Sequence, residues 1–462
     1  MNALPAFMSR DYFERLKADL MGQLSSGQHL YLSLAAEQTQ FIRINGHQVR
    51  TKETGARIRQ IGTVEEALLT CTYIHESAPG ILHRNVRTVT LCGDYGQDWD
   101  HAQSTITYLK TETPRIRQDL FAKLPERLTS SEKEQTGKLL SIHEAPEALL
   151  SPIASVDLAG IYSSGKMVRA MANSAGLLHW FSTDTFNFDY SLFTPSQRAV
   201  KATYSGTHWD TAAYAASITL SQDKLKRLDH PARKLGRGSY RAYLEPAAVH
   251  DLVNMFSWNC IGEASIQQGL SPLKKLRGGQ THFSKKFSLS EDFSRGDTPR
   301  FNEEGALAQE KLALIQDGRL TNALISSRSA KEYGLTPNGA SANETMRSPS
   351  VKTGSLKSSD MLKRLGTGLY LSNLHYLNWS DPAEARITGM TRYACFYVEN
   401  GEIIEPIENM RFDDTLFSLL GDALEEVSDQ AAIISNTDTY GMRSLGSAAI
   451  PGILVSEMKL TL

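Results

Sequence analysis

Residues 366–420 constrain the possible folds of this chain more than any other stretch. They contain three apolar runs, rich in β-branched and aromatic residues, which are separated by Ser380-Asp381-Pro382 and by Glu399-Asn400-Gly401. Asn-Gly between two such runs is a strong hairpin signal, because both central residues of a tight hairpin turn need positive φ. We therefore predict a β-meander with strands in residues 368–377, 385–398 and 402–407.

The N-terminal half combines helical periodicity with short apolar runs and turn residues. Ser9 can cap a helix whose residues Phe13, Leu16 and Leu20 share one apolar face. Further helices are predicted at 98–109, 115–124 and 210–228, and an exposed loop or helix end at 129–137. Strands are predicted at 31–34, 40–44, 56–61, 67–74, 155–162, 166–172 and 197–204, with turns at Asn45-Gly46 and Ser163-Ser164-Gly165 and a further hairpin within 177–193.

Hairpin-length connections favour antiparallel pairing, because parallel strands need crossover helices. The predicted fold class is therefore α+β, with two mixed domains dominated by antiparallel β-sheet. A chain of 462 residues exceeds what one hydrophobic core normally serves. Residues 229–238 are basic, contain Pro and Gly and lack apolar periodicity, so we place the domains at 1–230 and 231–462. The second domain should open with a strand at 240–244 and a helix begun by Pro246, followed by strands at 312–315 and 323–326 around a turn at Asp317-Gly318.

Charge and composition argue against two classes of partner. The net charge is −2 and the pI is about 6.7, so no global positive field favours nucleic acid or an anionic membrane. No apolar run approaches the roughly 20 residues that span a bilayer, and charges stand where a signal peptide would be apolar. The cysteines form no CxxC pair and fit reduced, mostly buried thiols. We expect a cytoplasmic protein with thiols at Cys71, Cys92, Cys260 and Cys395.

Four arginines alternate with apolar residues in the predicted N-terminal strands. Charges on a half-exposed sheet normally face water, which is one interpretation. The other is a cationic wall that attracts the carboxylates of peptides. The arginines are Arg43, Arg50, Arg57 and Arg59.

The order of motifs in the C-terminal half resembles one known family. A strand with Tyr and Trp before Asp-Pro is followed by Thr-Gly-x-Thr-Arg, Glu-Asn-Gly-Glu-Ile and Pro-x-x-Asn-x-Arg-Phe. This order is typical of the TldD/PmbA proteins, which are zinc-dependent peptidases and their partner subunits, once described as modulators of DNA gyrase. The resemblance runs from about Ile153 to the C-terminus and implies a β-meander or barrel-like C-terminal domain of the TldD/PmbA type. The matching residues include Thr388, Gly389, Thr391, Arg392, Pro406, Asn409, Arg411 and Phe412, and further upstream Asn302-Glu303-Glu304-Gly305.

The resemblance also implies where a zinc site would lie. In the peptidase members, the helix after the strand matched by 240–244 carries His-Glu-x-x-x-His, and a cysteine near the C-terminus is a third ligand. Here that helix reads His250-Asp251-Leu252-Val253-Asn254-Met255, and the nearest cysteine is Cys395. Methionine is a poor zinc ligand, and aspartate is one methylene shorter than the catalytic glutamate. We therefore predict no catalytic and no metal-binding residue in this chain, with His250 and Asp251 as the remaining metal candidates; the substrate-binding residues are unknown.

Two functional hypotheses follow from the resemblance. The first is a TldE-like subunit without a cofactor of its own, which pairs with a zinc-bearing TldD-type chain and helps to enclose a cavity where small unfolded peptides add to a sheet edge and are cut. The second is a homodimeric peptide-binding or scaffold protein without protease activity. A third hypothesis retains enzymatic activity, with His250, Asp251 and a ligand from another position binding a metal. None of the three involves nucleic acid or a membrane.

Overall fold

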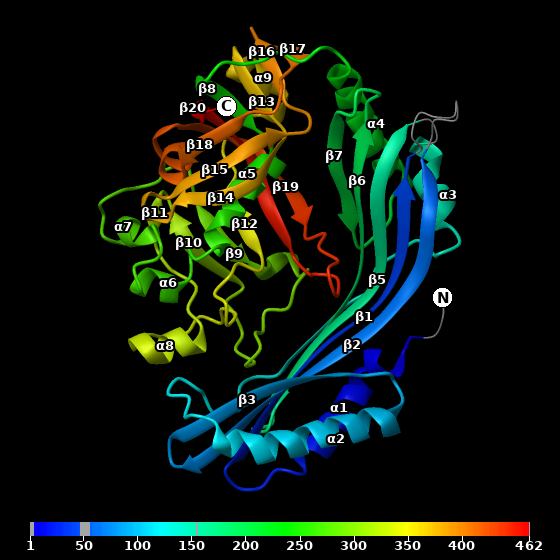
Figure 1. The fold of residues 1–462 in the computed structure, drawn as a ribbon, viewed down its shortest axis with the longest axis vertical. Coiled ribbons are helices and arrows are strands. Elements are labelled where there is room, and N and C mark those ends of the chain that lie inside the picture. Colours follow the sequence, from blue (N-terminus) through cyan, green and yellow to red (C-terminus); the bar gives the residue numbers. More distant parts are fainter. Residues whose placement is uncertain (1–3, 47–55, 154–155, 462) are drawn as a thin grey trace.

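A computed structural model of the chain describes residues 4–46, 56–153 and 156–461. Its strands form two sheets, one from the first half of the chain and one from the second (Figure 1). Most strand pairs in both sheets are antiparallel, and helices pack against the sheets. The predicted α+β class is confirmed.

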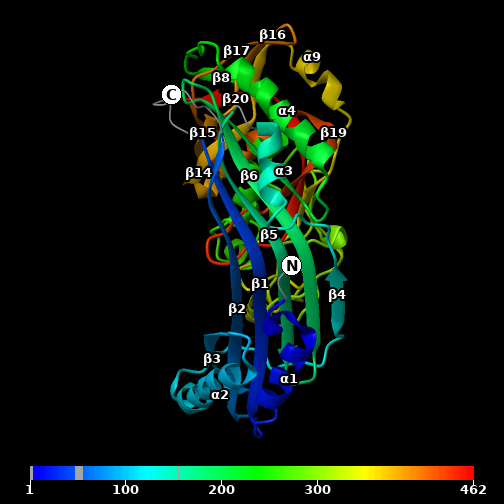
Figure 2. The same cartoon turned by 90° about the vertical axis from the view of Figure 1, so that its right-hand side faces the viewer.

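Long, curved strands dominate the N-terminal sheet (Figure 2). β1 pairs antiparallel with β2 on one edge and with β5 on the other. The outer edge of β6 is shared, because β4 pairs in parallel with its first half and β7 pairs antiparallel with its second half. The strands are β1 (Gln28–Asn45), β2 (Arg57–Ala78), β3 (Ile81–Thr90), β4 (Ser131–Gln135), β5 (Asp157–Asn173), β6 (Leu178–Phe193) and β7 (Ala199–Gly206).

Several predicted hairpins of this sheet are continuous strands instead. The four short strands predicted between 31 and 74 are two long ones, β1 and β2, and the residues after Gly46 lie outside the described ranges. The turn at Ser163-Ser164-Gly165 and the hairpin within 177–193 are wrong, because β5 and β6 run through them. Gly165 lets β5 pass close to β1: a Cβ there would lie 1.9 Å from the carbonyl oxygen of Gln38.

Two helices of the first half, α1 and α4, begin at the predicted positions, whereas the helix predicted at 98–109 begins earlier, at Tyr95, and α3 was not predicted. The Ser9 hydroxyl accepts a hydrogen bond from the Tyr12 N–H, and the Asp210 carboxylate accepts two at the start of α4. The helix predicted at 115–124 is wrong, since only a 3₁₀ turn forms there, and the loop predicted at 129–137 contains β4. The α-helices are α1 (Arg10–Met21), α2 (Tyr95–Glu112), α3 (Ala145–Leu150) and α4 (Thr211–Leu228).

β20 is the central strand of the C-terminal sheet and pairs with β8, β12, β18 and β19. The Asn400-Gly401 hairpin is confirmed, with φ of 53° and 82°, and it joins β16 to β17. The predicted strand 323–326 is wrong, and each of the first two predicted runs of the meander divides into two strands; over the described residues the sheet does not close into a barrel. The strands are β8 (Gly238–Leu244), β9 (Leu289–Asp292), β10 (Lys311–Gln316), β11 (Arg319–Leu320), β12 (Pro349–Val351), β13 (Gly368–Leu371), β14 (Asn373–Asp381), β15 (Arg386–Arg392), β16 (Phe396–Glu399), β17 (Glu402–Pro406), β18 (Arg411–Thr415), β19 (Leu424–Ser435) and β20 (Ser447–Leu460).

Short helices connect these strands. Pro246 occupies the first turn of α5, as predicted. The α-helices are α5 (Pro246–Asn254), α6 (Glu263–Gln267), α7 (Leu273–Arg277), α8 (Ser327–Tyr333) and α9 (Met361–Leu365). Along the whole chain there are 3₁₀ turns at Ala6–Met8, Thr113–Arg115, Ser151–Ile153, Met255–Ser257, Phe293–Arg295, Ser358–Asp360 and Pro382–Glu384, and a π-helical turn at Ser418–Asp422.

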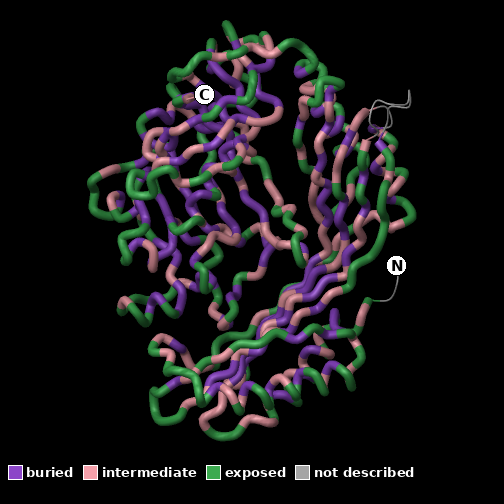
Figure 3. The backbone as a smooth tube through the Cα atoms, viewed as in Figure 1, coloured by how far each residue is buried: buried purple, intermediate pink, exposed green. Residues whose placement is uncertain are grey.

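The two sheets meet at two apolar clusters. Near α4, Val200 and Leu228 pack with Tyr243, Tyr370 and Phe396 of the C-terminal sheet. At the other end, Phe301 packs among buried residues of β1, β2, β5 and β6. Figure 3 shows buried residues concentrated inside the C-terminal unit and along the N-terminal strands. The two apolar clusters are thus two places where the sheets are in contact. The division into domains at 1–230 and 231–462 stays a prediction.

Three further expectations concern exposure. Arg43, Arg57 and Arg59 are exposed, as on a solvated face, and Arg50 lies outside the described residues. All four cysteines are free thiols, and all except Cys92 are buried. None of the helices in the described ranges has the length and apolar character needed to cross a membrane.

Candidate functional site

A cleft lies between the two sheets, formed by three adjoining hollows of about 620, 650 and 400 Å³. All three hollows share Asn436 and Leu445, in the loop that joins β19 to β20. Strands β7 and β19, helix α5 and this loop contribute many of the residues that line the cleft. We call this region the α5 cleft.

Helix α5 divides its residues between the core and the cleft. Val249, Leu252 and Val253 are fully buried in the C-terminal core. His250, Asp251 and Asn254 line the cleft instead. The helix is therefore amphipathic, and the two metal candidates of the sequence do face a concave surface.

His250 and Asp251 are partly desolvated, and both tend to lose their charge. Burial lowers the pKa of His250 to about 4, and its Nδ1 lies 3.5 Å from the Asn254 amide nitrogen. Burial raises the pKa of Asp251 to about 7, although the Leu374 N–H donates to its carboxylate at 3.2 Å and Lys201 favours the charged form. Near pH 5 both side chains are therefore neutral.

The residues at the positions of the zinc motif do not form a zinc site. Met255, at the position of the second histidine, is 1% exposed and packs in the core rather than lining the cleft. Cys395 is equally buried and donates to the Arg392 carbonyl oxygen, and burial raises the pKa of its thiol to about 11. Over the described ranges, no three side chains of His, Cys, Asp or Glu gather closely enough to hold a metal ion. A zinc ion of the family type has no matching ligand set at these positions.

Two ion pairs lie on the part of the cleft wall next to α5. Lys201 on β7 lies 2.7 Å from Asp189, and Lys224 on α4 lies 2.6 Å from Glu245. Thr203 also donates to Asp189. These carboxylates and ammonium groups offset one another, so this part of the wall carries little net charge.

Two sheet edges face the cleft. Among the described strands, β7 pairs only with β6 and β19 only with β20. Residues 354–356 bond to the first part of the other β19 edge, at residues 427–429, so the later part of that edge and the outer edge of β7 are left without a partner strand. The two edges meet where Ser205 and Ser435 share a 2.8 Å hydrogen bond and where the Asn187 amide donates to the Asn436 carbonyl oxygen. Beyond that point they diverge around the cleft (Figure 1).

The β19–β20 loop is anchored on the N-terminal sheet by a buried charged cluster. The Arg443 side chain is 1% exposed, and its Nη2 donates to the Thr185 hydroxyl at 2.7 Å. The backbone N–H of Arg443 donates to the carboxylate of Glu37, which is fully buried. Arg169 donates to the Arg443 carbonyl oxygen at 3.0 Å, and Glu37 stabilises the charge of both arginines. Sequence reasoning missed this cluster, because its members share no motif.

Known proteins match this arrangement in sequence. Residues 237–462 match the model of the PmbA/TldA metallopeptidase C-terminal domain. A segment of 162 residues is 34% identical to "Metalloprotease PmbA" of Escherichia coli O157:H7 and spans 35% of this chain and 32% of that protein. Residues 237–462 of this chain belong to the TldD/PmbA family. Its C-terminal sheet, with helix α5, lies inside the matched family domain.

Solved structures agree with the family fold over nearly the whole chain. TldE from Thermococcus kodakarensis superposes with a TM-score of 0.72 at 14% identity, over 98% of this chain and all of that one. A protein of Thermotoga maritima MSB8, described as a modulator of a DNA gyrase, gives 0.74 at 14% identity over 97% of this chain and all of that one. A similarly described protein of Bacteroides thetaiotaomicron VPI-5482 gives 0.74 at 12% identity over 98% of each. The N-terminal sheet, outside the matched sequence domain, therefore also follows the family's architecture.

Proposed function

We propose that this TldD/PmbA protein is a TldE-like subunit, which has no zinc of its own and acts with a zinc-bearing TldD-type chain on small unfolded peptides. The two faces of α5 are the main support. His250 and Asp251 face the cleft, whereas Met255 and Cys395 are buried in the core. The third hypothesis, in which this chain binds a metal, requires several ligands close together. Among the described residues, no three His, Cys, Asp or Glu side chains lie close enough to hold a metal ion.

In this proposal the cleft receives the peptide in an extended conformation. The free edges of β7 and β19 offer backbone N–H and C=O groups, which pair with an extended chain largely irrespective of its sequence. Ile433 on β19 lines the cleft and is 56% exposed, so it offers an apolar contact beside that edge. This chain would bind and orient the peptide while the partner cuts. The buried free thiols of three cysteines fit a reducing compartment, and we propose the cytoplasm.

Metal content and mass test the partnership. The chain is purified alone and after co-expression with a family member that has an intact His-Glu-x-x-x-His, and elemental analysis is combined with the mass from size-exclusion chromatography. We expect a metal-free protein alone, and a zinc-containing heterodimer that cleaves an unfolded peptide after co-expression. Stoichiometric zinc in the isolated chain, lost in His250→Ala but kept in the exposed-site control His282→Ala, would overturn the proposal.

A matched pair of variants tests the cleft itself. Ile433→Asp places a charge on the cleft wall, and Ile404→Asp places one on β17, where Ile404 is 48% exposed and does not line the cleft. We expect Ile433→Asp to slow peptide cleavage by the heterodimer without preventing pairing, and Ile404→Asp to leave cleavage unchanged. A homodimer that binds peptides but never exchanges with a zinc-bearing relative would instead establish the scaffold alternative.

A further inference from the structure

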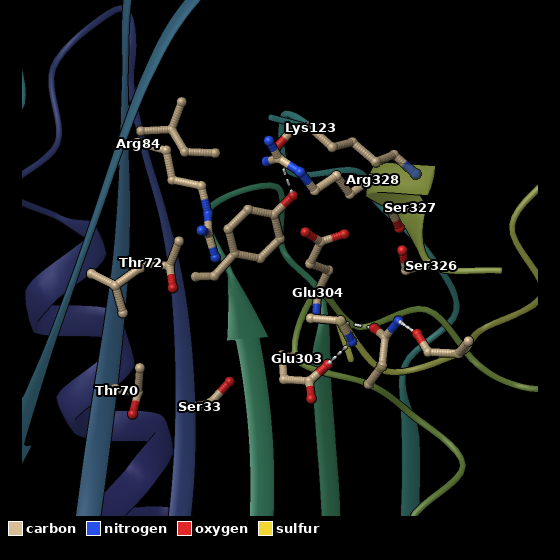
Figure 4. Close-up of a pocket in the computed structure, with 16 residues that line it drawn as sticks. Ser33, Thr70, Thr72, Arg84, Lys123, Glu303, Glu304, Ser326, Ser327 and Arg328 are labelled. Atoms are coloured by element: carbon tan, nitrogen blue, oxygen red, sulfur yellow. Dashed lines mark hydrogen bonds between the residues drawn. The ribbon is translucent and has the colours of Figure 1, made fainter. Parts of the chain in front are cut away.

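A fourth hollow, which adjoins the α5 cleft at Asn302 and Glu303, lies between the N-terminal sheet and the segment around α8. Its volume is about 240 Å³. Strands β1, β2 and β3 form one wall, and residues 302–304, 326–328, 340 and 342 form the other (Figure 4). It shares Ser33, Thr70, Asn302 and Glu303 with one hollow of the cleft, so the two spaces adjoin. We call it the Arg84–Glu304 pocket.

Arg84 supplies a positive charge on the strand wall. It lies on β3, whose pairing with β2 places it opposite Ile74. Among the described residues, it has no carboxylate within ion-pair distance. Burial raises the pKa of the neighbouring Tyr31 phenol, and the charge of Arg84 offsets part of that increase. Tyr31 itself is 4% exposed and donates to the Lys123 carbonyl oxygen at 3.1 Å. The guanidinium therefore faces the pocket from a rigid β-sheet.

Glu304 supplies a negative charge on the opposite wall. Figure 4 shows its carboxylate reaching into the pocket beside Ser326 and Ser327. Within the described ranges this carboxylate has neither a hydrogen bond nor an ion pair, whereas its backbone is held firmly: the Asn302 side chain accepts from the N–H groups of Glu304 and Ala306. The Gly305 carbonyl oxygen lies 3.0 Å from Nε2 of His179, which is fully buried. The loop thus holds a half-buried carboxylate in place without neutralising it.

The remaining charges of the pocket already have partners. Arg328 forms an ion pair with Asp119 at 3.1 Å, and Lys123 forms one with Glu126 at 3.1 Å. The Glu303 carboxylate accepts from the Ala342 N–H at 3.4 Å. Among the described pocket residues, Arg84 is the cation without an ion-pair partner and Glu304 is the carboxylate without any hydrogen bond, and they line the same small space from opposite walls, whereas Glu303 has only this N–H contact.

We propose that this pocket binds a small zwitterion, a free α-amino acid or a dipeptide. The ligand's carboxylate pairs with Arg84, and its ammonium group pairs with Glu304 beside the hydroxyl groups of Ser326 and Ser327. Arg84 is exposed and Glu304 is half-buried. Opposite charges on two walls of a concave site bind a ligand of the opposite charge pattern, because each charge gains a charge-assisted contact. A space of about 240 Å³ is smaller than pockets for larger ligands, which favours a molecule of this size. This site is separate from the α5 cleft and does not depend on the role proposed for that cleft.

Calorimetric titration of the full chain with free amino acids and dipeptides tests the proposal. We expect saturable binding of at least one of them, and no binding of the same compound when its amine is acetylated or its carboxylate is amidated. We expect Arg84→Gln and Glu304→Gln each to weaken binding about tenfold or more, since each removes one charge-assisted contact. The matched controls are Arg87→Gln, on the same strand with its guanidinium over the Tyr108 ring, and Glu332→Gln, exposed on α8.

The outcomes separate clearly. Loss of binding in the two pocket variants, with wild-type affinity in both controls and unchanged unfolding midpoints, supports the site. The proposal is overturned if no compound of the panel binds at millimolar concentration, if both blocked ligands bind as well as the free one, or if the pocket variants bind like wild type. Because the test uses the isolated chain and no peptidase partner, failure of the heterodimer proposal would not affect it.

Discussion

The α5 cleft and the Arg84–Glu304 pocket lie at the same boundary between the two sheets, but they differ in whether their charged side chains have ion-pair partners. In the cleft, Lys201 and Lys224 are paired with carboxylates, and burial favours the neutral forms of His250 and Asp251. In the pocket, Arg84 and Glu304 line opposite walls, and neither side chain has an ion-pair partner among the described residues. The cleft is thus suited to a backbone-recognised peptide, and the pocket to a small charged ligand.

In the described part of this chain, the concave surface next to the incomplete metal motif is not the one that presents unpaired charges. Paired or neutral groups stabilise the wall that they belong to, whereas an unpaired charge held by a rigid loop is available to a ligand. Four predictions test this contrast, beginning with the largest expected effect.

Glu37→Gln should destabilise the protein strongly. It removes the carboxylate that, among the described residues, stabilises the charges of Arg169 and Arg443 in the cluster anchoring the cleft loop, so a half-buried and a buried cation would be left without it. We expect a loss of about 3–5 kcal/mol in the free energy of unfolding, measured by urea denaturation. A loss below that of an ordinary surface substitution would mean that the cluster does not anchor the loop.

The pH dependence of stability should separate His250 from Asp251. The lowered pKa of His250 makes the folded state bind fewer protons than the unfolded state between pH 6.5 and 4, so its contribution is lost as the pH falls. The raised pKa of Asp251 has the opposite sign, and its contribution is lost as the pH rises from 3.8 to 7. The two effects oppose each other in the wild type.

Single variants expose each of these contributions. From pH 4.5 to 7, the free energy of unfolding should increase more in Asp251→Asn than in the wild type, and less in His250→Gln. Each difference should be on the order of 2–3 kcal/mol in urea titrations at several pH values. Changes of equal sign in the two variants would show that burial does not set these pKa values.

Rebuilding the zinc motif should fail. The double variant Asp251→Glu with Met255→His completes the motif in sequence, but position 255 lies in the core. We expect no stoichiometric zinc by elemental analysis, and a loss of about 1–3 kcal/mol from burying an imidazole there. Tight zinc binding by this variant would mean that the helix can rotate so that the side chains at positions 251 and 255 both face the cleft.

Glu304→Gln and Arg84→Gln should change stability least. Neither charge has a hydrogen-bond or ion-pair partner in the described residues, so each variant should stay within about 0.5 kcal/mol of the wild type. The same Glu→Gln change should therefore lower the free energy of unfolding strongly at Glu37 and hardly at all at Glu304. A loss of several kcal/mol at Glu304 would mean that its carboxylate stabilises the fold.

Local chemistry explains the elements that could be predicted. Asn400-Gly401, Ser9, Asp210 and Pro246 specify their turn or helix start through φ preference or a capping hydrogen bond with residues a few positions away. The hairpin predicted at Ser163-Ser164-Gly165 failed because these residues are buried against other parts of the molecule, and the sequence does not show that environment.

The sequence alone therefore determined several turns and helix starts, the family motifs, and the replacement of the zinc motif's glutamate and second histidine by Asp251 and Met255. Tertiary structure decided which face of α5 meets the cleft, joined Glu37 to Arg443 across 406 positions, and brought Arg84 opposite Glu304. The physical reason is range: capping and φ preferences act within a few residues, whereas burial and charge pairing depend on neighbours that only the packing of the two sheets supplies.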